Sequence, residues 1–271
     1  MSATAQTNPA PLRVMTYNLR FDNPADGDNR WAHRKDRVAA LIRFHCPDLF
    51  GVQEALPHQL HDLETALPEY SWYGAGREDG KEQGEFASVF YRRSRLGVLD
   101  QGTFWLSPTP EQPGKGWDAD VIRVCSWVKL RDAKTGGELY HFNTHFDHVG
   151  EEARQESAKL ILARIQSIAG ELPAILTGDL NTDPNSVAYR TLANNPSLRD
   201  AKHVTKTPHY GPDATWATFD VRQPHGPSDR IDYIFVTPQF TVLKHATLTD
   251  SRELRYPSDH LPVIAEVVLP E

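Results

Sequence analysis

Six short segments of the sequence join a hydrophobic stretch to residues that can bind a cation or move a proton. The clearest is LTGDLNTDPNS, residues 176–186, where Asp179 and Asn181 stand two positions apart after an apolar run. Side chains two apart on an extended chain point to the same face. A carboxylate and an amide on one face can bind a cation or handle a proton, so the segment predicts part of a catalytic site.

The same kinds of residue recur where five other expected strands begin or end. They are Asn18, Glu54, His145, Asp147, His148, Asp229, Asp232, Asp259 and His260. Single members have ordinary explanations, such as a turn for an asparagine or a helix cap for a carboxylate. Asp232 is harder to explain, because it lies in an apolar strand and a buried carboxylate needs a partner. Together the set favours a site at the strand ends.

The residue types also indicate which cofactor and substrate to expect. Carboxylate and amide oxygens suit a hard cation such as Mg²⁺ or Mn²⁺, whereas no cysteine and histidine cluster and no HExxH motif is present to bind zinc. The net charge is −7, and proteins that bind long nucleic acids usually carry a basic face. Long nucleic acid is therefore a less favoured substrate.

Strands and helices must position these side chains. Strand-like runs occur at residues 12–17, 49–53, 87–91, 121–130, 139–144, 174–177, 231–236 and 262–269. Helical spacing of apolar residues predicts helices over 34–44, 151–168 and 186–192. This order predicts two sheets packed together with helices outside, in one domain of residues 12–271 after a flexible tail of residues 1–11.

The sequence has no apolar run of the roughly 18 to 20 residues that span a bilayer, so we expect no membrane insertion. Its first residues lack the basic start and apolar centre of a secretory signal. Two cysteines are too few for a disulfide framework. We expect a cytoplasmic monomer, or an exported one if a signal peptide has been removed.

Six motifs in order resemble the endonuclease/exonuclease/phosphatase superfamily of deoxyribonuclease I-like, metal-dependent phosphoesterases. They are TYNLR, GVQE, NTHFDH, TGDLN, RIDYIFV and SDHLPV, and they run from Thr16 to Val263. The segment from Phe21 to Lys35 is similar to the first loop of a bacterial, deadenylase-like subgroup. The resemblance implies an α/β fold, a four-layered α/β sandwich with two mixed β-sheets face to face and helices outside.

The resemblance also implies roles for individual residues. Glu54, Asn18 and Asp259 would bind the metal, and Asp179 would activate the attacking water. Asn181 and His145 would hydrogen-bond the phosphate. His260 would contact the phosphate and would be oriented by Asp232. These roles fit hydrolysis at phosphorus, which needs a cation, aimed donors and one carboxylate free to act on water.

Four further residues are candidates for binding substrate, each with a structural alternative. Arg154 with His148 would bind a terminal phosphate, or Arg154 would pair with acidic neighbours on its helix. Trp31 and Trp216 would stack on a ring of the substrate or pack in the protein. We expect a small or short phosphoester as substrate, with a DNA or RNA nuclease as the alternative and an inactive binding protein as a further one. The loop GAGREDGKEQGE looks mobile.

Overall fold

The computed structural model describes residues 11–223, 226 and 229–269, and it contains two mixed sheets of six strands each. The first sheet has the order β11 (Thr241–Thr247), β12 (Val263–Val268), β1 (Leu12–Asn18), β2 (Leu49–Ala55), β4 (Phe86–Arg92) and β3 (Tyr70–Tyr73). The second has the order β5 (Leu96–Trp105), β6 (Val124–Asp132), β7 (Glu138–His145), β8 (Ala174–Asp179), β10 (Asp232–Val236) and β9 (Arg199–Asp200). Except for Pro11, the expected N-terminal tail lies outside the described residues.

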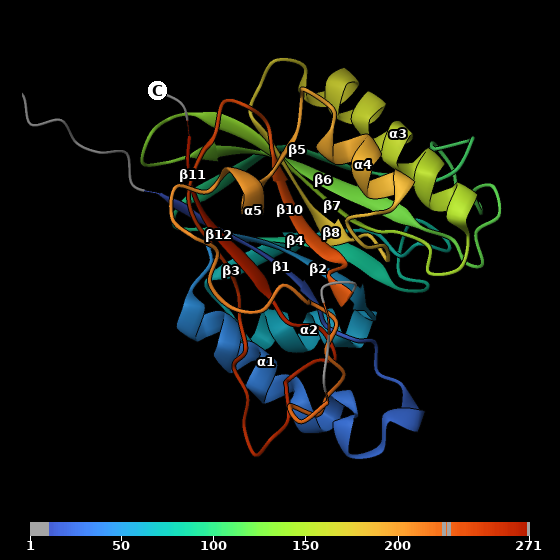
Figure 1. Ribbon diagram of the computed structural model, residues 1–271, viewed down its shortest axis with the longest axis vertical. Helices are drawn as coiled ribbons and strands as arrows, with labels where there is room; N and C mark the ends of the chain where they lie inside the picture. Colours follow the sequence, from blue (N-terminus) through green and yellow to red (C-terminus); the bar gives the residue numbers. More distant parts are fainter. Residues whose placement is uncertain (1–10, 224–225, 227–228, 270–271) are drawn as a thin grey trace, which may run out of the picture.

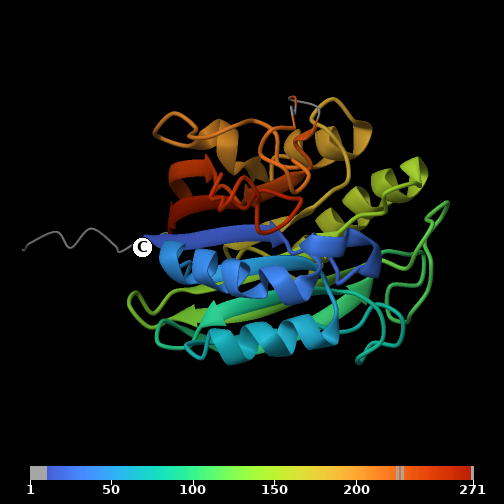
Figure 2. The ribbon, with the colours of Figure 1, turned by 90° about the horizontal axis from the view of Figure 1, so that it is seen from below.

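Helices cover the outer face of each sheet (Figures 1 and 2). The first sheet packs against α1 (Trp31–His45) and α2 (Pro57–Ala66), and the second against α3 (Glu151–Ala169) and α4 (Val187–Ala193). A short 3₁₀ helix, η1 (Pro24–Asn29), precedes α1, and α5 (Ala201–Val204) follows β9. A third apolar cluster, which includes Val14, Leu49, Val128 and Ile175, lies between the sheets. This arrangement confirms the predicted four-layered sandwich.

The strands that the sequence pattern does not predict are β3, β5, β9 and β11, which are the four edges of the two sheets. An edge strand is paired on one side only and tolerates polar residues, so its apolar alternation is weak. In β5 the burial pattern begins with one buried residue followed by seven that are exposed or intermediate. The predicted interior strands are all present, with ends shifted by up to three residues.

A buried polar layer joins the two sheets beneath the strand ends. Asn143 of β7 accepts hydrogen bonds at Oδ1 from Gln53 of β2 at 2.6 Å and from Thr177 of β8 at 2.9 Å. Its amide nitrogen donates to the carbonyls of Val52 and Ser88 in the first sheet. All these side chains are fully buried, so the layer fixes the spacing of the sheets.

Among the helices that the structure describes, none combines the length and the apolar character that crossing a membrane requires.

Candidate active site

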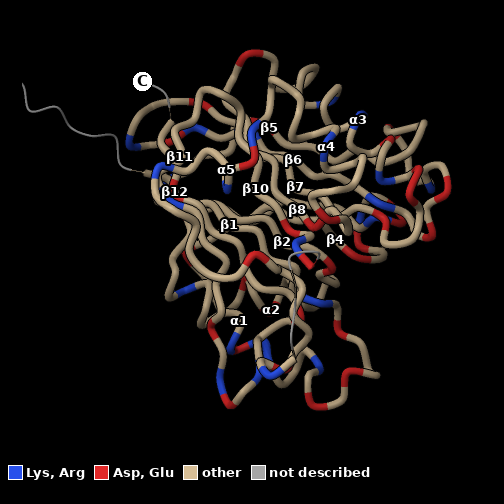
Figure 3. The backbone as a smooth tube through the Cα atoms, viewed as in Figure 1, with Lys and Arg blue, Asp and Glu red and all other residues tan. Residues whose placement is uncertain are grey.

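The pairing of the strands brings the predicted site residues to one end of both sheets. β1 and β2 run parallel, so Asn18 and Glu54 emerge together, and β7 and β8 run parallel with His145 opposite Asp179. β10 runs antiparallel to β8 and places Asp232 opposite Asp179. In the backbone view, acidic segments gather where β2, β4 and β8 meet (Figure 3). The sandwich therefore assembles one acidic site from separate strands.

Three site residues have a backbone conformation that L-residues rarely adopt. The φ angles are +56° at Arg20, +61° at Glu54 and +48° at Asn181. Glu54 also lies where the pairing of β2 with β4 is irregular, between Val52 and Ala55. Such conformations cost about 1 to 3 kcal/mol each and persist where the surroundings impose them, often at functional sites. Here they turn the side chains out of the strand direction.

Hydrogen bonds hold the Glu54 carboxylate from two sides. Oε1 accepts from the Asn18 amide nitrogen at 3.0 Å, and Oε2 accepts from the backbone N–H of Phe21 at 3.1 Å. The same Asn18 nitrogen donates to Asp179 at 2.9 Å, and the Asn18 oxygen accepts from the backbone of Arg20. An amide nitrogen cannot bind a cation. In this orientation Asn18 holds the two carboxylates in place, and its role as a metal ligand stays a prediction.

Asp179 is buried among acidic and basic groups. Its Oδ1 accepts from the backbone N–H of Asn181 at 2.8 Å, and its Oδ2 lies 3.4 Å from Nε2 of His145. Burial and the nearby Asp232 raise the pKa of the Asp179 carboxyl to about 7, while His260 acts in the opposite direction. A carboxyl that titrates near neutral pH can accept a proton from water.

His260 and Asp232 form a hydrogen-bonded pair. Its Nδ1 lies 2.9 Å from Oδ2 of Asp232, and its Nε2 lies 3.8 Å from Oδ2 of Asp179. Burial acts to lower the pKa of His260, but the carboxylates of Asp232 and Asp179 hold it well above its usual range. The ring is therefore a positively charged donor.

His145 and Asn181 meet on the other side of Asp179, where Arg123 joins them. One Arg123 nitrogen lies 2.8 Å from Nδ1 of His145, and another lies 3.2 Å from Nδ1 of His148. The amide nitrogen of Asn181 lies 2.9 Å from Nε2 of His145. Burial, followed by the charge of Arg123, lowers the pKa of His145 well below its usual range. His145 is thus a neutral ring beside a fixed cation.

These groups line one cavity of about 410 Å³. Eight predicted residues line it, namely Glu54, His145, His148, Asp179, Asn181, Trp216, Asp259 and His260. Sequence reasoning did not select its other lining residues, which are Arg20, Phe21, Glu85, Arg123 and Ile231. Arg123 lies just before β6, and Glu85 lies in a charged loop. Neither belongs to a motif that would distinguish it, in the sequence, from an ordinary surface charge.

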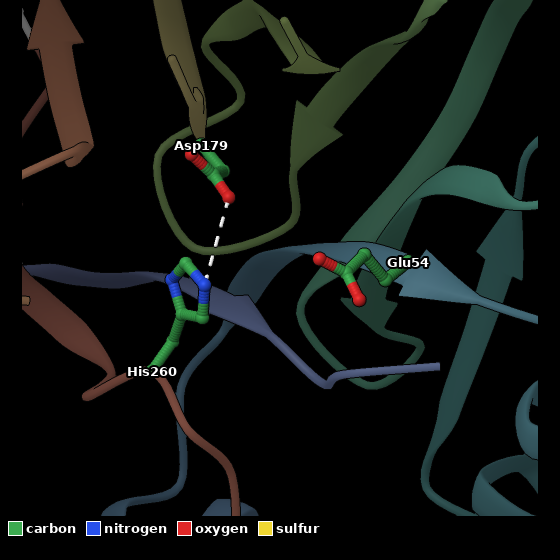
Figure 4. A group of neighbouring side chains, drawn as sticks. All are labelled: Glu54, Asp179 and His260. Carbon is green, nitrogen blue, oxygen red and sulfur yellow. Dashed lines mark ion pairs between the residues drawn. The ribbon is translucent and has the colours of Figure 1, made fainter. Parts of the chain in front are cut away.

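The donor set of the cavity fits a divalent cation. One ligand atom from each of Glu54, Asp179 and His260 lies within 4.8 Å of the other two, and Figure 4 shows the three side chains facing a common space. Asp259 lines the same cavity, and burial raises the pKa of its carboxyl. Carboxylates gathered in one cavity repel one another, and a bound cation would relieve that repulsion.

Two of the proposed substrate-binding residues do not reach the cavity. Trp31 is the first residue of α1, is 2% exposed and donates from Nε1 to Asp62 at 2.8 Å, so it is a core residue. Arg154 is not among the residues that line the cavity and donates to the backbone carbonyl of Asp147. His148 and Trp216 do line it, and Trp216 is 42% exposed.

The loop GAGREDGKEQGE is held by specific contacts. Arg77 pairs with Glu85 at 2.7 Å, Trp105 donates from Nε1 to the carbonyl of Arg77, and Asp79 accepts two backbone hydrogen bonds from Lys81 and Gln83. The expectation of a mobile loop came from its glycines and charges, which here form turns and ion pairs that set Glu85 in the cavity wall.

Comparisons with known proteins agree with this geometry. Residues 15–260 match the sequence profile of the Endonuclease/Exonuclease/phosphatase family. A crystal structure of a protein of that family from Bacteroides thetaiotaomicron is 40% identical, with a TM-score of 0.93 over 97% of this chain and 99% of that one. The structure of a mannosyl-6-phosphatase from the same species is also 40% identical, with a TM-score of 0.91 over 95% of this chain and all of that one.

A curated relative at greater distance is Nocturnin of Drosophila melanogaster, which is 22% identical over 88% of this chain. The chain spans 42% of the length of that protein.

Proposed function

The chain belongs to the endonuclease/exonuclease/phosphatase family, whose members hydrolyse phosphoesters, and from this premise we propose that it removes the phosphate from small sugar phosphate monoesters with Mg²⁺ or Mn²⁺ as cofactor. A relative with 40% identity over nearly the whole chain is a mannosyl-6-phosphatase, which supports a sugar phosphate as the substrate.

The observation that carries this proposal is a cavity of about 410 Å³ that combines an acidic centre with an exposed tryptophan. This volume lies near the lower end of the range for small-molecule sites. The flat face of Trp216 can pack against the C–H face of a pyranose ring, because an aromatic ring offers a large apolar surface. A nuclease would instead need an extended basic groove, and Figure 3 shows lysine and arginine scattered along the chain.

The residues of the cavity divide the chemical work. Glu54 and Asp259 would hold the cation, and His260, which also lies close enough to be a ligand, would instead contact the phosphate. When bound, the cation would stabilise negative charge on the phosphate oxygens. Asp179 would orient the attacking water and accept its proton, and Asn181, fixed by its own backbone bond to Asp179, would hydrogen-bond the phosphate.

Positive groups on two sides would stabilise the negative charge that builds up at phosphorus. His260 would donate from Nε2 to a phosphate oxygen, because its Nδ1 is occupied by Asp232. On the other side, the guanidinium of Arg123 lies against His145 and would act on the phosphate through that ring or directly. A donor aimed at the transition state is worth about 10² to 10³ in rate.

The test is a comparison of substrates. Purified protein is assayed with mannose 6-phosphate, glucose 6-phosphate, bis-p-nitrophenyl phosphate and single-stranded oligonucleotides, each with Mg²⁺, Mn²⁺ or EDTA. We expect the hexose phosphates to give a kcat/KM at least about 100-fold above the diesters, with no turnover in EDTA or in Asp179→Asn. Faster, Asp179-dependent cleavage of the oligonucleotides would instead establish the nuclease alternative.

A further inference from the structure

Arg34 is a buried arginine of α1 whose guanidinium donates its hydrogen bonds to backbone carbonyls. It is 3% exposed, and its Nε donates to the carbonyl of Asn29 at 2.9 Å. Nη1 donates to the carbonyls of Leu19 and, at 3.2 Å, Pro257, and Nη2 donates to that of Arg20. Within the described part of the chain Arg34 makes no ion pair. Burying a charge is costly, so its presence here calls for a role.

The carbonyls of Leu19 and Arg20 bear on the position of Glu54. Leu19 and Arg20 form the turn at which Arg20 has a positive φ, and Arg34 binds the carbonyls on both sides of this turn. The next backbone N–H, that of Phe21, donates to Glu54. An arginine that fixes this turn therefore also fixes a donor that holds Glu54 in place.

The carbonyl of Pro257 belongs to the loop that supplies Asp259 and His260. Pro257 precedes Ser258, whose hydroxyl donates to the backbone carbonyl of Asn18 at 2.8 Å. Arg34 and Ser258 thus tie this loop to the end of β1. One guanidinium joins the segment that steadies Glu54 to the segment that carries Asp259.

The surroundings of Arg34 suit a guanidinium and no other cation. Its central carbon lies 5.1 Å from the ring centre of Trp31 and 5.5 Å from that of Phe219. A planar group can contact two rings while donating in several directions, whereas lysine has one nitrogen on a flexible stem. The carboxylates of Asp259 and Glu54 also favour the charged form of Arg34. Its positive charge therefore offsets part of the negative charge of the site.

We propose that Arg34 is a positioning residue for the cation site. It holds the turn at Arg20 and the loop at Asp259 together as one rigid unit. This inference rests on the metal-dependent function proposed above. Arg34 does not line the cavity, so its effect is exerted through Glu54 and Asp259.

Arg95 provides a matched control. It is 5% exposed, donates to the backbone carbonyl of Pro11 and pairs with Asp48 and Asp132, each at 3.1 Å. Pro11 and Asp48 lie just before β1 and β2, and Asp132 is the last residue of β6, so all three lie at the opposite end of the sheets from the site. The variant Arg95→Lys tests the loss of a buried guanidinium at a position remote from the cavity.

The experiment compares wild type, Arg34→Lys and Arg95→Lys by calorimetric titration with Mn²⁺ and by thermal unfolding without metal. We expect both variants to unfold at lower temperature. Only Arg34→Lys should bind Mn²⁺ more weakly, by about 10- to 100-fold, which is typical when a residue that orients metal ligands is replaced. The Mn²⁺ concentration for half-maximal phosphate release should rise by the same factor.

Unchanged Mn²⁺ affinity in folded Arg34→Lys would overturn the inference and leave the proposed function standing. Wild-type protein that binds no Mn²⁺ would overturn the proposed function, and the inference with it. If Arg34→Lys does not fold, hydrogen exchange of the wild-type protein tests the proposed rigid unit instead. Mg²⁺ should then slow exchange at residues 19–21, 29–34 and 257–260 together, and protection of residues 19–21 alone would refute the rigid unit.

Discussion

Nδ1 of His260 lies 2.9 Å from Oδ2 of Asp232, and both side chains are buried. Asp232 pairs with Asp179 across the two strands. The register of β10 with β8 therefore places Asp232, which bonds His260, beside Asp179, the residue proposed to act on water. One strand pair therefore determines the spacing between Asp179, the proposed general base, and His260, the proposed hydrogen-bond donor to the phosphate.

Replacing Asp232 with asparagine should lower kcat by about 10² or more while KM changes little. The variant loses the negative charge that holds the proton on His260, because burial alone lowers the pKa of that ring. Steady-state kinetics with a hexose phosphate at pH 7 measure this effect, and circular dichroism checks the fold. A kcat within threefold of wild type would show that His260 needs no orienting carboxylate.

Asp179→Asn should have opposite effects on activity and stability. Turnover should fall by about 10² to 10⁴. Folding raises the pKa of Asp179 from 3.8 to about 7, so its contribution destabilises the protein progressively as the pH rises from about 4 to 7. Without metal at pH 8, the variant should unfold at least about 3 °C higher than wild type, with a smaller gain at pH 5.

Differential scanning calorimetry at both pH values tests this prediction. Mg²⁺ should raise the unfolding temperature of wild type more than that of Asp179→Asn. A variant that is less stable than wild type at pH 8 without metal would mean that the Asp179 carboxylate is well compensated in the folded protein.

Trp216→Ala and Trp31→Phe should separate substrate binding from packing. Trp216 is partly exposed in the cavity, whereas Trp31 is buried and bonded to Asp62. We expect Trp216→Ala to raise KM for hexose phosphates about 10-fold with a small change in unfolding temperature. Trp31→Phe should leave KM unchanged and lower the unfolding temperature. Equal KM values for wild type and Trp216→Ala would remove Trp216 from the substrate site.

The sequence predicts the interior of this fold better than its margins. Central strands such as β1 and β8 are buried on both faces, so they appear as apolar runs that stop at polar residues. Edge strands such as β5 and β11 alternate irregularly and carry exposed polar residues. Because the site lies at the ends of central strands, its acids and histidines could be predicted from the same signal as the strands.

Residues that act from outside those strand ends could not be predicted. Arg34 lies on a helix, in a short basic cluster of the sequence, and Arg123 lies just before β6, in a mainly apolar run. Their importance comes from burial and from partners as far as 223 residues away, which only the folded chain brings together. The orientation of the Asn18 amide depends in the same way on Glu54 and Asp179.

Gly51→Ala should prevent or severely weaken folding. A Cβ at this position would lie 2.1 Å from Oδ1 of Asn143 and 2.4 Å from Oγ1 of Thr177, within the polar layer between the sheets. Those side chains cannot move without breaking buried hydrogen bonds. The free energy of unfolding should fall by about 3 kcal/mol or more. Gly97→Ala, where a Cβ meets nothing within 4 Å, is the control for the loss of a strand glycine.

Buried His245 should make the protein less stable in acid. It is 3% exposed, and its Nδ1 lies 2.9 Å from Nδ1 of His209. Burial lowers the pKa of His245 from 6.5 to about 3. The stability due to its neutral form is therefore complete above pH 6.5, and it is lost as the pH falls towards 3, because the unfolded chain takes up the proton first.

Urea unfolding of wild type and His245→Asn at pH 7 and pH 5 measures this loss. One proton taken up on unfolding changes stability by about 1.4 kcal/mol per pH unit, so the fall between these pH values should be about 1 to 2 kcal/mol smaller in the variant. His141, whose pKa burial also lowers to about 3, contributes in the same direction and is unchanged in both proteins. His61→Asn, at an exposed position, is the control for removing a histidine. An equal fall in wild type and His245→Asn would show that His245 takes up its proton in the folded state, with His209 as the partner that rearranges.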